Sequence, residues 1–202
     1  MKELMHVKTI LSIMTISFLC SGCGGSSGSD DYQGSTSNHN NPEGNTPPVE
    51  TTPGETPLSL CGENTSIQQL LDKVNAIRSK ARYCGEAHYP ATAKLTWNKN
   101  LAKAAQAHSD DMAVNNYFSH TGLDGSNIGD RALAAGYNYR YTGENIAAGQ
   151  ESIDEVMEAW LKSPGHCANM MSVDFKEYGM ACASNSQSKY KTYWTQEFGT
   201  RQ

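Results

Sequence analysis

Apolar residues at helical spacing predict the first well-defined helix of the chain. The Thr65–Gln68 stretch has the pattern of a capping box, in which side chains bond the free N–H groups that begin a helix. From there the apolar side chains lie three or four positions apart, at Ile67, Leu70, Leu71, Val74 and Ile77. This is the period of one buried helix face, so the segment is expected to pack against a core.

Two more helices follow before the middle of the domain. Asn98 is placed to cap a helix whose inward face carries Leu101, Ala104, Ala105, His108 and Met112. A shorter helix is expected over residues 128–135, where Gly136 closes it. On this pattern His108 is interpreted as a hydrogen-bonded core histidine.

Two helices are expected to adjoin between residues 152 and 171. Ser152–Glu155 forms another capping box and directs Ile153, Val156 and Trp160 inward. Pro164 ends that helix and begins a short one, with Ser163 as its cap, because proline suits the first helical position but not the interior.

Alternating side chains predict strands in the second half of the chain. The alternation runs through Tyr137–Tyr141, through Tyr178–Cys182 and, beyond a turn at Asn185-Ser186, through residues 190–198. The last two segments are predicted to form a terminal β-hairpin. Helices mixed with antiparallel strands indicate an α+β layered domain, and no internal repeat is visible.

The start of the chain has the composition of a targeting segment. Two lysines precede an apolar run over residues 10–19, and small residues follow, as in a secretory signal. The end of this run, Leu19-Cys20-Ser21-Gly22-Cys23, resembles the cleavage box of bacterial lipoproteins. Residues 1–23 are therefore predicted to be a signal peptide cleaved before Cys23, which would be lipidated; plain secretion and an uncleaved anchor are the alternatives.

Residues 24–60 are predicted to be a disordered linker, since they are rich in Gly, Ser, Thr, Asn and Pro and have almost nothing to bury. All their charges are acidic.

Residues 61–202 hold 14 Lys and Arg against 15 Asp and Glu, a net of −1, so the charge of −5 arises mostly in the linker. No basic surface for nucleic acid is expected. Residues 61–202 are long enough to bury a single core.

Four cysteines fall in this predicted domain, and an even number in an exported domain favours disulfides. Three pairings are conceivable. Cys61–Cys84 with Cys167–Cys182 is preferred because it closes the two local loops. A Cys₄ zinc site is the weaker rival, since no CxxC pair is present.

Several motifs, in this order, resemble those of the CAP superfamily, also called SCP domains. The family includes cysteine-rich secretory proteins, plant pathogenesis-related proteins and venom allergens, and the likeness is greatest to its bacterial branch. The motifs span about residues 67–199: His108–Ala113, Asn116–Gly122, Gly143–Gly149, Trp160 with Ser163–Asn169, Phe175–Gly179 and Tyr193–Gln196.

The resemblance implies a three-layer α-β-α sandwich with a cleft lined by two histidines and two acids. Carried over to this chain, these are His120, Glu144, His166 and Glu177. The sequence departs from the eukaryotic pattern His-Tyr-Thr-Gln, because Tyr193 stands where that histidine would be. The acid expected one turn after Trp160 is likewise replaced, by Ser163.

Two imidazoles and two carboxylates suit either a divalent metal such as zinc, with His120 and His166 as ligands, or general acid–base work. A buried structural network is the plainer interpretation of the same residues. The position of His166 near a helix N-terminus is expected to lower its pKa. Ser119 is not favoured as a nucleophile, because neighbouring side chains on an extended chain point apart.

Three functions remain open. The first is a binding module for a lipid-like or peptide ligand, as some relatives of the family are. The second is a metal-dependent hydrolase in which Glu144 or Glu177 activates water. The third is a purely structural envelope or adhesion module. In each case we expect an exported monomer, held to a bacterial membrane by a lipid at Cys23 or secreted.

Overall fold

The computed structural model describes residues 58–202. The predicted signal peptide and the linker lie outside these residues, except for the last three linker positions, Leu58–Leu60. These form strand β1, which pairs with β2 (Glu63–Thr65) in an antiparallel hairpin. No helix in the described part of the chain is both long and apolar enough to cross a membrane.

A four-stranded sheet forms the middle layer of the domain. Its strand order is β5 (Thr96–Trp97), β7 (Glu177–Ser184), β8 (Thr192–Arg201) and β6 (Tyr139–Ala148). The β5–β7 pair is parallel and the other two pairs are antiparallel. The predicted terminal hairpin is confirmed as β7 and β8, and β6 lies at one edge of the sheet.

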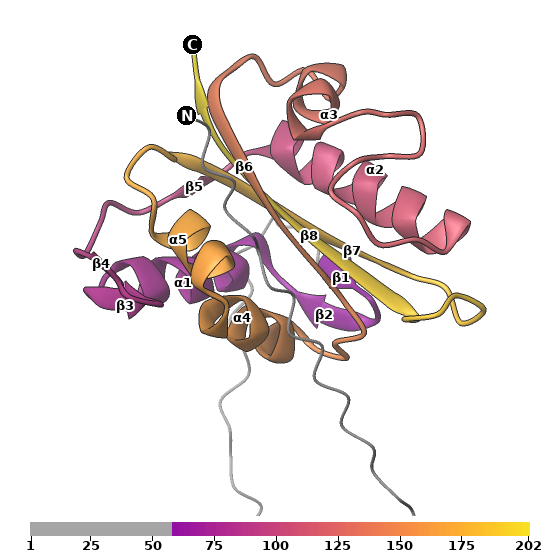
Figure 1. The fold of residues 1–202 in the computed structure, drawn as a ribbon, viewed down its shortest axis with the longest axis horizontal. Coiled ribbons are helices and arrows are strands. Elements are labelled where there is room, and N and C mark those ends of the chain that lie inside the picture. The colour runs from indigo at the N-terminus through magenta and orange to yellow at the C-terminus, as the bar shows by residue number, and fades with distance from the viewer. Residues whose placement is uncertain (1–57) are drawn as a thin grey trace, which may run out of the picture. The chain divides into compact units, whose positions relative to one another are not determined.

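Helices cover both faces of this sheet, which confirms the α-β-α sandwich (Figure 1). On one face lie α2 (Lys99–Asn115) and α3 (Ile128–Ala134). On the other face lie α1 (Ile67–Arg78), α4 (Ile153–Lys162) and α5 (Pro164–Met171). A small antiparallel hairpin, β3 (Arg82–Cys84) with β4 (Ala87–Tyr89), follows α1.

Each face of the sheet has its own apolar core, as strand alternation requires. Trp194, Phe198 and Tyr178 face the three-helix side, where they pack with Val74 and Trp160. A second cluster forms on the α2 side of the sheet around Met112, Ala113, Ile146, Ala183 and Tyr193. The alternation along β6 and β8 therefore assigns each of their side chains to one face.

The helix caps follow the sequence patterns with two differences. Asn98 and Ser152 cap α2 and α4 as predicted, but the capping box of α1 uses Ser66 with Gln69, one position later than expected. Ser163 precedes α5 without a side-chain cap hydrogen bond. Pro164 alone explains the break, because it fits the first turn of α5 and cannot continue α4.

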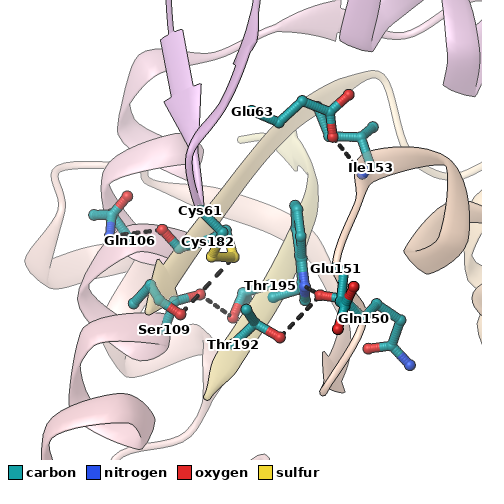
Figure 2. Close-up of a disulfide and its surroundings, with 12 residues drawn as sticks. Cys61, Glu63, Gln106, Ser109, Gln150, Glu151, Ile153, Cys182, Thr192 and Thr195 are labelled. Atoms are coloured by element: carbon teal, nitrogen blue, oxygen red, sulfur yellow. Dashed lines mark hydrogen bonds between the residues drawn. A yellow bond between two sulfur atoms is a disulfide. The ribbon is translucent and has the colours of Figure 1, made fainter. Parts of the chain in front are cut away.

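The predicted disulfide pairing is wrong, although all four cysteines are bonded. Cys61 joins Cys182 and Cys84 joins Cys167, at sequence separations of 121 and 83. The sheet brings distant segments together: Figure 2 shows Cys61, just after β1, against Cys182 on β7. The nearby carboxylate of Glu63 accepts a hydrogen bond from the N–H of Ile153, at the start of α4. The N-terminal hairpin is thus fixed to both sheet and helix.

Candidate functional site

Strand β6 carries the central acid of the site. Glu144 lies on the face of the sheet that α2 and α3 cover, and its side chain is 2% exposed. Gly143 precedes it, and a Cβ there would collide with the ring of Phe175. Only glycine therefore allows β6 to pass Phe175 and place Glu144 at this point.

Two side chains, an imidazole and a guanidinium, bond the carboxylate of Glu144. The ring Nδ1 of His120 lies 2.7 Å from its Oε1, and the guanidinium of Arg131 donates to its Oε2 at 2.6 Å. Arg131 also donates to the backbone oxygen of His120 at 3.1 Å, so it fixes the loop as well as the acid. Burial raises the pKa of Glu144, but the His120 hydrogen bond and the Arg131 charge outweigh it and hold the pKa below the ordinary value.

His120 and His166 come from opposite sides of the β6 edge and lie close enough for the charge of His120 to affect the pKa of His166. His120 comes from the loop after α2, and its side chain is 58% exposed. His166 lies in the first turn of α5, and its pKa is lowered, first by burial and then by the charge of His120. The predicted direction is thus confirmed, but its causes are burial and the neighbouring imidazole rather than the helix N-terminus. His166 is a neutral base at neutral pH.

Buried amides hold α5 against β6. Asn145 donates to the backbone oxygen of His166 and to Gln196 Oε1, each at 3.1 Å. Asn169 donates to the Glu144 carbonyl at 3.0 Å and to Asn145 Oδ1 at 2.9 Å. The side-chain amides of Asn145, Asn169 and Gln196, which belong to three of the motifs named above, therefore position His166 relative to Glu144.

The disulfide of α5 has a different partner from the one expected. Cys167 bonds Cys84 of the β3–β4 hairpin, so it does not tie α5 to the strand that carries Glu177. The bond still acts next to His166, because it fixes the first turn of α5 to an element outside the sheet.

Glu177 does not join the other three predicted residues. It accepts hydrogen bonds from Asn98 Nδ2 and Tyr137 OH, both at 2.7 Å, and from Arg201 Nε at 3.2 Å. Burial opposes its ionisation, yet these hydrogen bonds and the Arg201 charge lower its pKa. Glu177 therefore joins α2, β7 and β8 in a hydrogen-bond network of its own. Among the four predicted residues, a hydrogen bond joins His120 to Glu144, and His166 lies on the helix that Asn145 and Asn169 hold against β6. The cleft site itself stays a prediction.

A fourth ionisable residue lies beside Glu144, and the sequence interpretation missed it. Glu197 of β8 is directly opposite Glu144 in the β6–β8 register and is fully buried. Its signal in the sequence was a charged residue between Gln196 and Phe198, in a strand predicted from its alternating side chains. The strand alternation places it on the opposite face from those two side chains.

His108 lies in the same buried cluster. Its Nε2 is 2.9 Å from the Ser119 carbonyl oxygen and 3.9 Å from Glu144 Oε2. Burial is the main cause that lowers its pKa, ahead of the opposing charge of Glu144. The interpretation of His108 as a core histidine is confirmed. Ser119 contributes its backbone oxygen to this contact.

An apolar groove of about 300 Å³ begins at His166. Three aromatic side chains line it: Phe118, Trp160 and Tyr190. Consecutive β6 residues, Ile146 to Ala148, also line it. Because neighbouring strand side chains point to opposite faces, a groove that touches all three runs along the outer edge of β6 rather than over a face.

Among the described residues, side chains form hydrogen bonds with some of the outward backbone groups of β6, but not with those of Ala148. Trp160 Nε1 donates to the Ile146 carbonyl at 3.0 Å, and Asn169 occupies the Glu144 carbonyl in the same way. Gly149 N–H donates inward, to Thr192 of β8. In an antiparallel ladder the direction alternates with each residue, so the N–H and C=O of Ala148 point outward, into the groove.

The described side chains do not complete a metal site. Within residues 58–202 no group of three or more His, Cys, Asp or Glu side chains could hold a metal ion. Both carboxylate oxygens of Glu144 are engaged, one by His120 and one by Arg131, so Glu144 is not free to act as a ligand. Its contact with Nδ1 leaves Nε2 as the ring nitrogen of His120 that could bind a metal, and a carboxylate on the other nitrogen is usual for a metal-ligating histidine. The metal site at His120 and His166 stays a prediction.

Comparison with known proteins gives a consistent result. The family model of the cysteine-rich secretory protein family (CAP) matches residues 71–198. The chain is 32% identical to the uncharacterized membrane protein YlbC of Bacillus subtilis (strain 168) over 136 residues, which are 67% of its length. It is 35% identical to the uncharacterized protein YkwD of the same organism over 104 residues, which are 52% of its length. These matches span 35% and 38% of the two relatives, so most of each relative has no counterpart here.

Solved structures share the fold. An extracellular protein of Bacillus anthracis str. Ames that contains an SCP domain is 32% identical, with a TM-score of 0.55 over 67% of this chain and 40% of that one. An outer surface protein of Borrelia burgdorferi gives a TM-score of 0.54 at 21% identity, over 67% and 92% of the two chains. The second likeness concerns the fold alone.

Proposed function

The chain belongs to the cysteine-rich secretory protein (CAP) family, and from this premise we propose that it is an exported binding module that holds an extended peptide in the groove beside β6. The observation that carries the proposal is the outer edge of β6 in the groove. There the backbone of Ala148 presents an N–H and a C=O between aromatic walls.

An edge of this kind selects peptide over lipid. A peptide strand offers the N–H and C=O groups that pair with those of Ala148, as in β-strand addition, and its side chains pack on Phe118, Trp160 and Tyr190. An acyl chain would cover the same backbone groups without hydrogen bonds, at a cost of roughly 1–3 kcal/mol per group. A lipid-like ligand is therefore the second candidate.

The metal-dependent hydrolase is the third candidate, because no group of three or more ligand side chains forms a metal site among residues 58–202. Of the three polar residues His120, Glu144 and His166, His166 lines the groove. The neutral imidazole of His166 can donate to, or accept from, a peptide backbone group.

The substitution Ala148→Pro tests the peptide proposal. It removes the outward N–H of β6 and leaves the β8 ladder in place, since the Ala148 N–H does not belong to that ladder; proline is tolerated at such edges. Short peptides selected from a random library on the full chain would serve as probes, and fluorescence anisotropy would measure their affinity. We expect Ala148→Pro to weaken binding at least tenfold, whereas Ala148→Ser, which keeps the N–H, changes it little.

A matched probe separates the two ligand classes. A copy of the best peptide with methylated backbone nitrogens should bind poorly to the unchanged protein. A fluorescent fatty acid that binds equally to the Ala148→Pro and unchanged proteins, together with no peptide recovered from the library, would establish the lipid-like ligand instead.

We propose further that the domain is held to a bacterial envelope membrane through a lipid on Cys23. The Leu19–Cys23 cleavage-box pattern supports this proposal. Metabolic labelling with a fatty acid should mark the unchanged chain and not the Cys23→Ser chain; label that stays on the variant would exclude the anchor.

A further inference from the structure

We infer that Glu197 is a neutral carboxylic acid that donates its proton to the carboxylate of Glu144, so that these two buried groups beneath His120 carry one proton in total. The interior beside Glu144 thereby contains a neutral carboxylic acid. Its protonation does not depend on the peptide proposed above.

The sheet register brings the two carboxyl groups together. Glu144 and Glu197 are directly opposite on antiparallel strands, so both side chains project from the same face of the sheet. Cβ atoms of such pairs are about 4.5–5.5 Å apart, within reach of a hydrogen bond between glutamate side chains. Two carboxylates so close, away from water, repel each other strongly, and only one of them can ionise readily.

The surroundings decide which carboxyl group keeps the proton. Arg131 of α3 and His120 of the preceding loop both bond Glu144, which stabilises its charge. Glu197 is 0% exposed, and neither of its oxygens has a hydrogen-bonding partner among the described residues. A carboxylate in that position would have no donor, whereas a carboxylic acid can donate its proton to Glu144.

The other elements packed against Glu197 bring no second positive charge. His108 of α2 directs its Nε2 at the Ser119 carbonyl, and burial keeps its pKa below the ordinary value, so it is neutral at neutral pH. The residue opposite Glu197 on β7 is Gly179, which does not ionise. Burial and the Glu144 charge raise the pKa of Glu197 well above the ordinary value, and Arg131 opposes them only in part.

Loss of this proton would break the O–H bond of Glu197, pass the proton to solvent and leave a second buried negative charge beside Glu144. Arg131 already bonds Glu144 and offsets only one of the two charges. The proton on Glu197 therefore lets Glu144 keep its contacts with His120 and Arg131 without a second carboxylate next to it.

Carbon-13 NMR of the full chain labelled at the glutamate carboxyl carbons tests the inference. We expect one glutamate in the unchanged protein to keep the chemical shift of a neutral acid at pH 7. Ordinary glutamates are ionised there, because pH 7 is far above their usual pKa. The Glu197→Gln chain should lack that signal.

Glu177→Gln is the matched control. Glu177 is likewise a glutamate on a strand of the sheet, but it is only partly buried and is hydrogen-bonded to Asn98, Tyr137 and Arg201. Its substitution should leave the neutral-acid signal unchanged. Ionisation of every glutamate in the unchanged protein at pH 7 would overturn the inference without any variant having to fold. Survival of the neutral signal in Glu197→Gln would overturn it too.

Discussion

Arg78 is a fully buried arginine whose side chain serves backbone carbonyls rather than a carboxylate. It donates to the oxygens of Ala93, Met170 and Ser172 at 2.7–2.9 Å, and to that of Phe175 at 3.4 Å. Burial lowers its pKa to about 10, so the guanidinium is charged at neutral pH. It thereby joins the end of α1 to the end of α5, the helix that carries His166.

The substitution Arg78→Met should destabilise the domain by about 3 kcal/mol or more, because several buried carbonyls lose their donor and each costs roughly 1–3 kcal/mol. Arg82→Met is the control. Arg82 donates only one hydrogen bond, to the Ile77 carbonyl, and is partly exposed, so about 1 kcal/mol is expected. Urea unfolding of both variants measures the difference, and equal losses would contradict the role given to Arg78.

The sequence contained part of this information. Arg78 follows Leu70 and Val74 at intervals of four, on the same helix face, so periodicity alone places it inward. A cation at such a position needs partners, but its acceptors are carbonyls up to 97 positions away. Backbone acceptors have no sequence signature, which is why the residue was not singled out.

Helix α5 shows how elements combine to place a single side chain. Three attachments hold it: Arg78 at its C-terminal end, the Asn145 and Asn169 amides on its sheet side, and the Cys84–Cys167 disulfide in its first turn. The helix has only eight residues, too few to be stable alone, so its position depends on these contacts.

The two disulfides should therefore differ in effect on the site but not on stability. In the chain-entropy model, closing loops of 83 and 121 residues contributes about 4–5 kcal/mol each. We expect Cys84→Ala/Cys167→Ala and Cys61→Ala/Cys182→Ala to lose similar free energies of unfolding. Only the first pair should weaken peptide binding and move the His166 ring resonance in NMR spectra. Equal losses of binding would show that the disulfide near His166 has no separate role.

Local patterns predicted the elements well, and long-range pairings poorly. The helices of residues 67–78, 99–115 and 153–162 follow from capping residues and apolar period, which are local properties. The cysteine pairing depends on which distant strands meet. A preference for short loops therefore chose Cys61–Cys84, whereas the sheet places Cys61 beside Cys182.

At the scale of the whole molecule, the site lies where the three layers meet around the β6 edge. His120 comes from the α2 side, Glu144 from the sheet and His166 from the opposite helical layer. Motif resemblance named these three residues, and the structure places His120 in contact with Glu144; their joint function stays a prediction. The resemblance did not single out Glu197, because only the β6–β8 register shows that this strand glutamate, and not Glu177, lies opposite Glu144.

The buried cluster also gives the molecule a pH-dependent stability whose sign differs between residues. Glu144 and Glu177 have lowered pKa values, so their stabilisation is present above about pH 4.3 and is lost below it. His108 has a lowered pKa, so the protein loses stability as the pH falls below about 6.5, where the unfolded histidine takes up a proton and the folded one resists it.

Glu197 acts in the opposite direction and dominates above about pH 6.5. Its raised pKa means that the folded state keeps a proton that the unfolded chain has lost. The free energy of unfolding should therefore fall by about 1.4 kcal/mol per pH unit until Glu197 ionises in the folded protein. Urea unfolding between about pH 6.5 and 9 should show this decline in the unchanged chain and in Glu177→Gln, but a nearly flat profile in Glu197→Gln.

The slope of the free energy of unfolding with pH is the test, since any pH-independent loss of stability caused by the glutamine does not change it. Parallel profiles for the unchanged and Glu197→Gln chains would mean that Glu197 is already ionised in the folded state, and that the sheet tolerates two buried carboxylates around Arg131.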